Sequence, residues 1–139
     1  MKVLFICKGN MFRSQIAEAI YNKLTNSHDA SSAGTYTGTP DEPEGQRLAD
    51  LMSADAPQFT ILEENGMNIG NNVTKKLTPE MLDEADVVVS MAEEPYIPEF
   101  LKNDKRVIWW NFGNPDDASP EFVRETYERL DKLIREMLH

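Results

Sequence analysis

The only cysteine of this chain, Cys7, stands in the segment CKGNMFRS, which also contains Gly9, Asn10, Arg13 and Ser14. An arginine six residues after the cysteine can donate two parallel hydrogen bonds to an oxyanion. A glycine permits the backbone angles that turn successive N–H groups toward an anion. Ser14 is placed to donate a hydrogen bond from its hydroxyl to the sulfur, which stabilises the thiolate, the nucleophilic form of cysteine. The segment therefore predicts a phosphate-binding loop with Cys7 as nucleophile.

The alternative interpretation is that Cys7 is a small buried side chain, as free cysteines often are. That interpretation assigns no role to Gly9, Asn10, Arg13 or Ser14. We therefore favour the nucleophile.

Such a loop needs a strand before it and a helix after it. The apolar run KVLFI predicts a buried strand ahead of Cys7, and Ile16, Ala17, Ile20 and Leu24 share one face of a helix beginning near Ser14. SSAGTYTGTPDEPEG predicts a short strand running into a loop, and DVVVSM and RVIWWNF predict two further strands. Further helices are expected at 44–52, at 57–64 with Gly66 just beyond, at TPEMLDEA, and from Pro120 with Ser119 as cap. Strands alternating with helices predict an α/β fold with a parallel sheet.

The composition predicts one ordinary globular domain spanning residues 1–139. The net charge of −10 argues against nucleic acid or an anionic membrane as partner. One cysteine cannot form an internal disulfide, and the two histidines, His28 and His139, give no metal-ligand pattern. We therefore expect a cytoplasmic protein without metal or cofactor, either a monomer or a weak dimer.

The sequence also resembles a known family. VLFICKGNMFRSQIAEAI is similar to the phosphate-binding signature of low-molecular-weight protein tyrosine phosphatases and the related arsenate reductases. The similarity continues through SAGT at 32–35, NGMNIGNNVTKKLTPEMLDEADVVVSM and a Trp-x-Phe-x-x-Pro pattern at 110–115, leaving out residues around 51–59. It implies a four-stranded parallel sheet in the order 2-1-3-4, flanked by helices, with the phosphate-binding loop after the first strand.

The resemblance implies a role for each residue of this loop. Cys7 would form a phosphocysteine, Arg13 would bind the phosphate and the transition state, and Ser14 would ease formation and release of the thiolate. Asn10 and Ser32 would hold the loop's shape. The phosphate-binding residues would be Lys8, Gly9, Asn10, Met11, Phe12 and Arg13.

The resemblance breaks at the general acid, which in the family's phosphatases is an Asp directly before a Pro. Here Asn114 precedes Pro115, and an amide cannot deliver a proton. Asp116 and Asp117 follow, and Asp116 is at most about 7 Å of extended chain away, so a modest loop rearrangement would present it as the acid. Alternatively both aspartates are solvated loop residues that are also able to cap the final helix.

Two further positions depart from the family. Phe12 stands where many members carry a second cysteine, so no disulfide can protect Cys7 from oxidation. The family's phosphatases tend to have aromatic residues after the Asp-Pro pair, and this chain lacks them. Tyr36 and Trp110 are candidates to line the site, although either could belong to the core. Specificity for phosphotyrosine does not follow from these residues.

Three functions stay open. The first is a phosphomonoester hydrolase acting on a small phosphorylated molecule or a phosphotyrosine-containing protein. The second is an arsenate reductase that uses an external thiol, since the chain has no further cysteine. The third is a weakly catalytic or non-catalytic phosphate- or phosphopeptide-binding module, favoured by Asn114 and opposed by the retained Cys7, Arg13 and Ser14.

Overall fold

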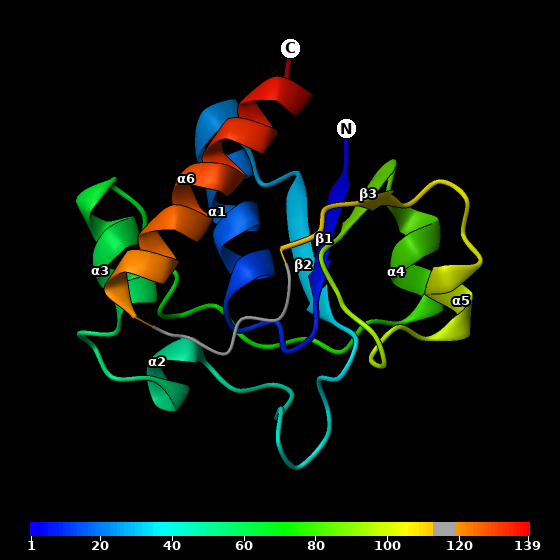
Figure 1. Ribbon diagram of the computed structural model, residues 1–139, viewed down its shortest axis with the longest axis horizontal. Helices are drawn as coiled ribbons and strands as arrows, with labels where there is room; N and C mark the ends of the chain where they lie inside the picture. Colours follow the sequence, from blue (N-terminus) through cyan, green and yellow to red (C-terminus); the bar gives the residue numbers. More distant parts are fainter. Residues whose placement is uncertain (113–118) are drawn as a thin grey trace.

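The computed structural model describes residues 1–112 and 119–139. Its strands are β1 (Val3–Cys7), β2 (Ala30–Gly34), β3 (Val87–Ser90) and β4 (Ile108–Trp109). Its helices are α1 (Arg13–Thr25), α2 (Leu48–Leu51), α3 (Pro57–Glu64), α4 (Pro79–Glu84), α5 (Glu99–Lys102) and α6 (Pro120–Met137). The strands pair in parallel in the order β2-β1-β3-β4 (Figure 1). The expected α/β class and strand order are confirmed.

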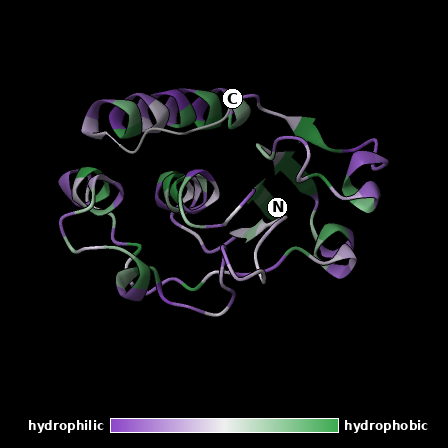
Figure 2. Ribbon diagram, turned by 60° about the horizontal axis from the view of Figure 1, so that its bottom comes forward, coloured by the Kyte–Doolittle hydropathy of each residue, from purple (hydrophilic) through white to green (hydrophobic). Residues whose placement is uncertain are grey.

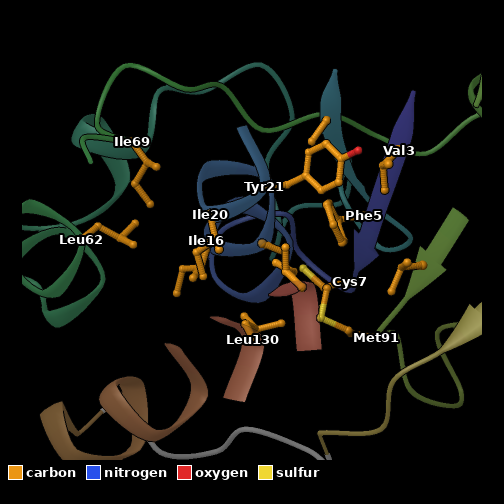
Figure 3. Close-up of a cluster of buried hydrophobic side chains, with 14 of the residues drawn as sticks. Val3, Phe5, Cys7, Ile16, Ile20, Tyr21, Leu62, Ile69, Met91 and Leu130 are labelled. Carbon is orange, nitrogen blue, oxygen red and sulfur yellow. The ribbon is translucent and has the colours of Figure 1, made fainter. Parts of the chain in front are cut away.

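The sheet is covered by helices on both faces, and this explains why every residue of β1 is buried. Phe5 packs in a cluster with side chains of α1, α3 and α6, including Ile16, Leu62 and Leu130 (Figure 3). Leu4 and Ile6 point to the other face, where α4 and α5 lie (Figure 1). Alternate residues of one strand therefore supply two hydrophobic cores, and the carboxyl end of β1 lies between them.

The final helix, α6, forms as its sequence predicts. Ser119 Oγ accepts a hydrogen bond from Phe122 N at 3.2 Å, so the serine caps the helix. Val123, Leu130 and Ile134 are buried on the inner face of α6, and its other face carries hydrophilic residues (Figure 2). This helix packs against α1 and thereby fixes the helix that follows the phosphate-binding loop.

Three elements differ from the expectation. β4 has only two residues, and Trp110, directly after it, packs its ring on Phe5, with centroids 6.1 Å apart. α2 begins only at Leu48, because Arg47 is extended and Gly45 has a φ of +75°. Residues 99–102 form a short helix, α5, that the sequence did not predict. The helix at 57–64 is confirmed, and Gly66 beyond it has the expected positive φ.

A search of the helices in residues 1–112 and 119–139 found none with the length and apolar character of a membrane span.

Candidate active site

The phosphate-binding loop, residues 7–13, joins the carboxyl end of β1 to the first turn of α1 (Figure 1). The end of β2 packs tightly against it: Thr35 N donates to Cys7 O at 2.9 Å and Tyr36 N donates to Lys8 O at 2.8 Å. A Cβ on Gly34 would lie 2.8 Å from Lys8 O, so only glycine fits there. The neighbouring strand thus holds the loop from one side.

Cys7 ends β1 with a buried side chain, 3% exposed, at the border of the larger core (Figure 3). Its Sγ lies 3.0 Å from Ser14 Oγ and accepts the backbone N–H of Asn10 at 3.3 Å. Ser14 Oγ also accepts a hydrogen bond from Asn10 Nδ2 at 2.8 Å. Because that bond occupies a lone pair of the hydroxyl, the hydroxyl proton is free to point at the sulfur. The predicted contact between Ser14 and Cys7 is present.

Asn10 is fully buried and has a φ of +56°, in the left-handed region that few residues adopt. Its Oδ1 accepts hydrogen bonds from Lys75 N at 2.8 Å and from Gln15 Nε2 at 3.3 Å. Gln15 Nε2 also donates to the Asn10 carbonyl at 3.1 Å. These bonds hold the loop in its turn, as expected for Asn10.

Ser32 lies further from the loop than expected. Its Oγ donates to Glu18 Oε1 at 3.0 Å, and Glu18 Oε2 accepts from Asn72 Nδ2 at 3.3 Å. Asn72 Nδ2 also donates to Gln15 Oε1 at 3.1 Å, and Gln15 bonds the loop. Ser32 is therefore connected to the loop through a series of partly buried side-chain hydrogen bonds rather than directly. The residues joined by these hydrogen bonds are called the supporting cluster below: Asn10, Gln15, Glu18, Ser32, Asn72 and Lys75.

The supporting cluster contains a half-buried acid, Glu18, and a half-buried base, Lys75. Burial raises the pKa of Glu18, while Lys75 and the hydrogen bond from Ser32 act to lower it. Burial lowers the pKa of Lys75, and the nearby Glu18 carboxylate opposes that shift. Neither residue stood out in the sequence, because each becomes significant only when α1 and the segment before α4 lie together.

Arg13 is 4% exposed and is held by the segment that follows β3. Its Nη1 donates to Met91 O at 2.6 Å, and its Nη2 lies 3.0 Å from Glu93 Oε2. A guanidinium has five N–H donors, so three remain for a bound anion. Glu93 was missed in the sequence. The sequence signal that could have found Glu93 is its place just after a buried strand. Parallel strands bring their carboxyl ends to one edge of the sheet, so an acidic residue there can meet Arg13.

Beside the loop lie Lys8, Tyr36, Glu42 and Tyr96, which we call the mouth cluster. Lys8 Nζ stands 5.2 Å from the centroid of the Tyr36 ring and 4.2 Å from that of Tyr96. The two rings are 4.8 Å apart, and Lys8 Nζ is 3.8 Å from Glu42 Oε1. Tyr36 thus lies next to the loop, as one of the two interpretations held.

Trp110 belongs to the core, which was the other interpretation, since its ring packs on Phe5. Met11 and Phe12 are half-buried, and the Phe12 ring packs 6.1 Å from Phe122 of α6. The side chain that replaces the family's second cysteine therefore anchors the loop to the final helix.

The predicted acid loop, with Asn114, Asp116 and Asp117, lies outside the described residues. Across residues 1–112 and 119–139, no group of three or more His, Cys, Asp and Glu side chains could hold a metal ion.

A family model described as low molecular weight phosphotyrosine protein phosphatase matches residues 2–138. The chain belongs to this family. The resemblance inferred from the sequence is confirmed, and it covers the phosphate-binding loop and all the elements around it.

Relatives within the low molecular weight phosphatase family carry different names. A protein-arginine-phosphatase of Bacillus subtilis is 22% identical over 99% of this chain and 94% of its own length. A glutaredoxin arsenate reductase of Synechocystis is 27% identical over 96% of this chain and 95% of its own. The crystal structure of a low molecular weight protein tyrosine phosphatase from T. tengcongensis superposes with a TM-score of 0.73. It is 27% identical and covers 99% of this chain and 97% of its own. Both phosphatases and arsenate reductases are thus among its relatives.

Proposed function

We propose that this protein is a cysteine-dependent phosphomonoester hydrolase that works through a phosphocysteine on Cys7. One observation carries the proposal: Cys7 Sγ lies 3.0 Å from Ser14 Oγ and 3.3 Å from Asn10 N, directly before the first turn of α1. A purely structural cysteine would have no need of these donors, whereas a thiolate is stabilised by them.

In the proposed reaction the backbone N–H groups of residues 8–13 and the three unused donors of Arg13 bind the phosphate oxygens. The Cys7 thiolate attacks phosphorus, the bond from phosphorus to the leaving oxygen breaks, and that oxygen takes the electron pair. Water then attacks the phosphocysteine, and the sulfur departs as a thiolate stabilised by the Ser14 hydroxyl. Asn10 holds the loop directly, and Ser32 acts through Glu18.

The leaving oxygen needs a proton unless it is a good leaving group. From the sequence we propose Asp116 for this role, with Asn114 and Asp117 in the same loop, and that assignment stays a prediction. The proposal covers a single domain of residues 1–139, acting in the cytoplasm as a monomer or weak dimer without nucleic acid.

The substrate class we propose is an aryl phosphate, either a small molecule or a phosphotyrosine-containing protein. The rings of Tyr36 and Tyr96 beside the loop support it, because aromatic side chains pack favourably on an aryl group. The name of the Bacillus subtilis relative makes phosphoarginine a further substrate to test.

The deciding experiment is steady-state hydrolysis of p-nitrophenyl phosphate by the reduced protein and by Cys7→Ser. We expect turnover by the native protein and none by the variant, with the melting temperature little changed because serine is nearly isosteric. A native protein without turnover, or a variant that keeps it, would contradict the proposal.

A second candidate, arsenate reduction with an external thiol, is supported by the arsenate reductase of Synechocystis among the relatives. It is tested with arsenate, glutathione and a glutaredoxin, by following arsenite formation. Arsenite production without hydrolysis of any phosphate ester would favour this candidate.

A further inference from the structure

The carboxyl group of Glu42 lies against the phosphate-binding loop. If Gly9 carried a Cβ, that atom would be 2.5 Å from Glu42 Oε2 and 3.0 Å from Glu42 Cδ, so the carboxyl occupies space that a side chain at residue 9 would need. Glu42 Oε1 lies 3.8 Å from Nζ of Lys8, the residue after the nucleophile. One carboxyl group thus touches the loop at two successive residues, 8 and 9.

The backbone around Glu42 is held by its own hydrogen bonds. Glu42 O accepts from Gly38 N at 2.7 Å and from Thr39 N at 3.2 Å, and Glu42 N donates to Thr39 O at 3.1 Å. This turn follows β2, whose end is bonded to the phosphate-binding loop through Thr35 and Tyr36. The backbone of Glu42 is therefore linked to the phosphate-binding loop through this turn and the hydrogen bonds of Thr35 and Tyr36.

The surroundings of Glu42 raise the pKa of its carboxyl group. Its side chain is 16% exposed, and Oε2 is buried with no hydrogen-bond partner. Burial raises the pKa of Glu42, Lys8 acts to lower it, and the neighbouring Asp41 and Glu93 carboxylates raise it further. A phosphate dianion entering the loop would add to the negative charge nearby and raise the pKa again. The atom Oε2 makes no hydrogen bond to any other group, so a proton carried there would have no acceptor within the protein.

We propose that Glu42 is the proton donor for the leaving group, in the place that the sequence assigned to Asp116. In an in-line displacement the leaving oxygen departs on the side opposite the attacking sulfur, and the proposal requires Glu42, which contacts the loop at residues 8 and 9, to reach that oxygen. As the Cys7 sulfur bonds to phosphorus and the bond to the leaving oxygen breaks, Glu42 Oε2 gives its proton to that oxygen and becomes a carboxylate.

The second half of the reaction returns the proton. The Glu42 carboxylate accepts a proton from the water that attacks phosphorus, the sulfur–phosphorus bond breaks, and Cys7 recovers its thiolate as inorganic phosphate is released. Protons and electron pairs balance over the cycle without any further reactant. This inference rests on the proposed hydrolase function and adds the identity of its acid.

The test compares two substrates that differ in their need for an acid. p-Nitrophenyl phosphate has a good leaving group and phenyl phosphate has a poor one. In Glu42→Gln we expect kcat/KM for phenyl phosphate to fall about 10²- to 10⁴-fold, and kcat/KM for p-nitrophenyl phosphate to fall much less. In the native protein kcat/KM for phenyl phosphate should decline as pH rises above the pKa of Glu42, and the variant should lack that decline.

The matched control is Asp41→Asn, which removes the adjacent exposed carboxylate from the same turn. In this variant the ratio of kcat/KM for p-nitrophenyl phosphate to kcat/KM for phenyl phosphate should stay as in the native protein. Inhibition by inorganic phosphate and the melting temperature report whether Glu42→Gln leaves the loop intact. Equal losses on both substrates, or a retained alkaline decline, would overturn the role of Glu42 while leaving the hydrolase proposal standing. A selective fall of kcat/KM for phenyl phosphate in Asp116→Asn or Asp117→Asn, and not in Glu42→Gln, would assign the acid to the other loop. A native protein that hydrolyses neither substrate would overturn both proposals.

Discussion

The two sides of the phosphate-binding loop are built in opposite ways. On the supporting side, Asn10, Ser14, Gln15 and Ser32 are at most 1% exposed, and each makes a hydrogen bond to another side chain. On the mouth side, Lys8, Tyr36, Glu42 and Tyr96 are half-buried, and Glu42 Oε2 has no partner. The first side holds the loop in its turn and contacts Cys7 through Ser14 and Asn10, whereas the second lies beside Lys8 and Gly9.

This difference predicts two kinds of response to mutation. Changes on the supporting side should cost stability, because they leave buried polar groups without partners. Changes at the mouth should cost little stability and should alter how rate depends on substrate or pH. Four measurements test the comparison, from the largest expected effect to the smallest.

The largest effect is expected from Arg13→Lys, because Arg13 stands at the proposed anion site between the two sides. Lysine keeps the charge but loses the planar pair of donors, so kcat/KM for p-nitrophenyl phosphate should fall about 10²- to 10³-fold. Arg47→Lys, at an exposed arginine paired with Asp50, is the matched control and should keep full activity. If kcat/KM is unchanged in Arg13→Lys, Arg13 has no role in the reaction.

The supporting side is tested by two asparagines that share a positive φ, Asn10 at +56° and Asn26 at +50°. Glycine suits both backbone conformations, so replacement isolates the side chain. Asn10→Gly removes the bonds to Ser14, Gln15 and Lys75 and should lower the free energy of unfolding by about 2 kcal/mol. Asn26→Gly, at the exposed end of α1, should change it by less than about 0.5 kcal/mol. Urea denaturation measures both, and equal changes would contradict the comparison.

The supporting side should also carry a pH dependence through Glu18. Because burial raises the pKa of Glu18 in the folded protein, its contribution to stability is full below the unfolded pKa and is lost as pH rises through the folded pKa. Between acidic and neutral pH the free energy of unfolding should therefore fall less steeply in Glu18→Gln than in the native protein. Urea denaturation across that range measures the slope, with Glu128→Gln on the exposed face of α6 as control. A slope unaltered by Glu18→Gln would contradict the assignment.

The smallest effect is expected from Lys8→Met at the mouth, and it rests on the role inferred for Glu42. Lys8 lowers the pKa of Glu42, so its removal should raise that pKa and move the alkaline decline of kcat/KM to higher pH. The backbone N–H of residue 8 is kept, and the lost cation–π contacts should cost no more than about 1 kcal/mol of stability. pH–rate profiles beside those of Lys105→Met, an exposed lysine, measure the shift. A shift to lower pH would contradict the sign of this coupling.

Most of the fold followed from local patterns. KVLFI and DVVVSM are short apolar runs that belong to strands covered on both faces, and β1 and β3 confirm them. RVIWWNF has the same composition and yields only two strand residues, with Ile108 43% and Trp109 44% exposed. Its apolar character reflects packing of Trp110 on Phe5 rather than strand length, and local composition cannot distinguish the two.

The candidate site divides in the same manner. Cys7, Asn10, Arg13 and Ser14 were predicted because they lie within eight consecutive residues, between a strand and a helix. Glu93 was missed because it lies 80 residues from Arg13 along the chain. Glu42 was not predicted, since a single glutamate in a polar loop carries no signal of burial.

By itself the sequence determined the phosphate-binding loop, because every donor that converges on Cys7 comes from one short segment whose geometry follows from the strand before it and the helix after it. Only the tertiary structure decided what surrounds that loop. A parallel sheet brings the carboxyl ends of β1, β2 and β3 to one edge, and so places Glu42, Glu93 and Lys75 beside residues that are far away in the sequence. Their burial, and hence the pKa of Glu42, depends on these long-range contacts.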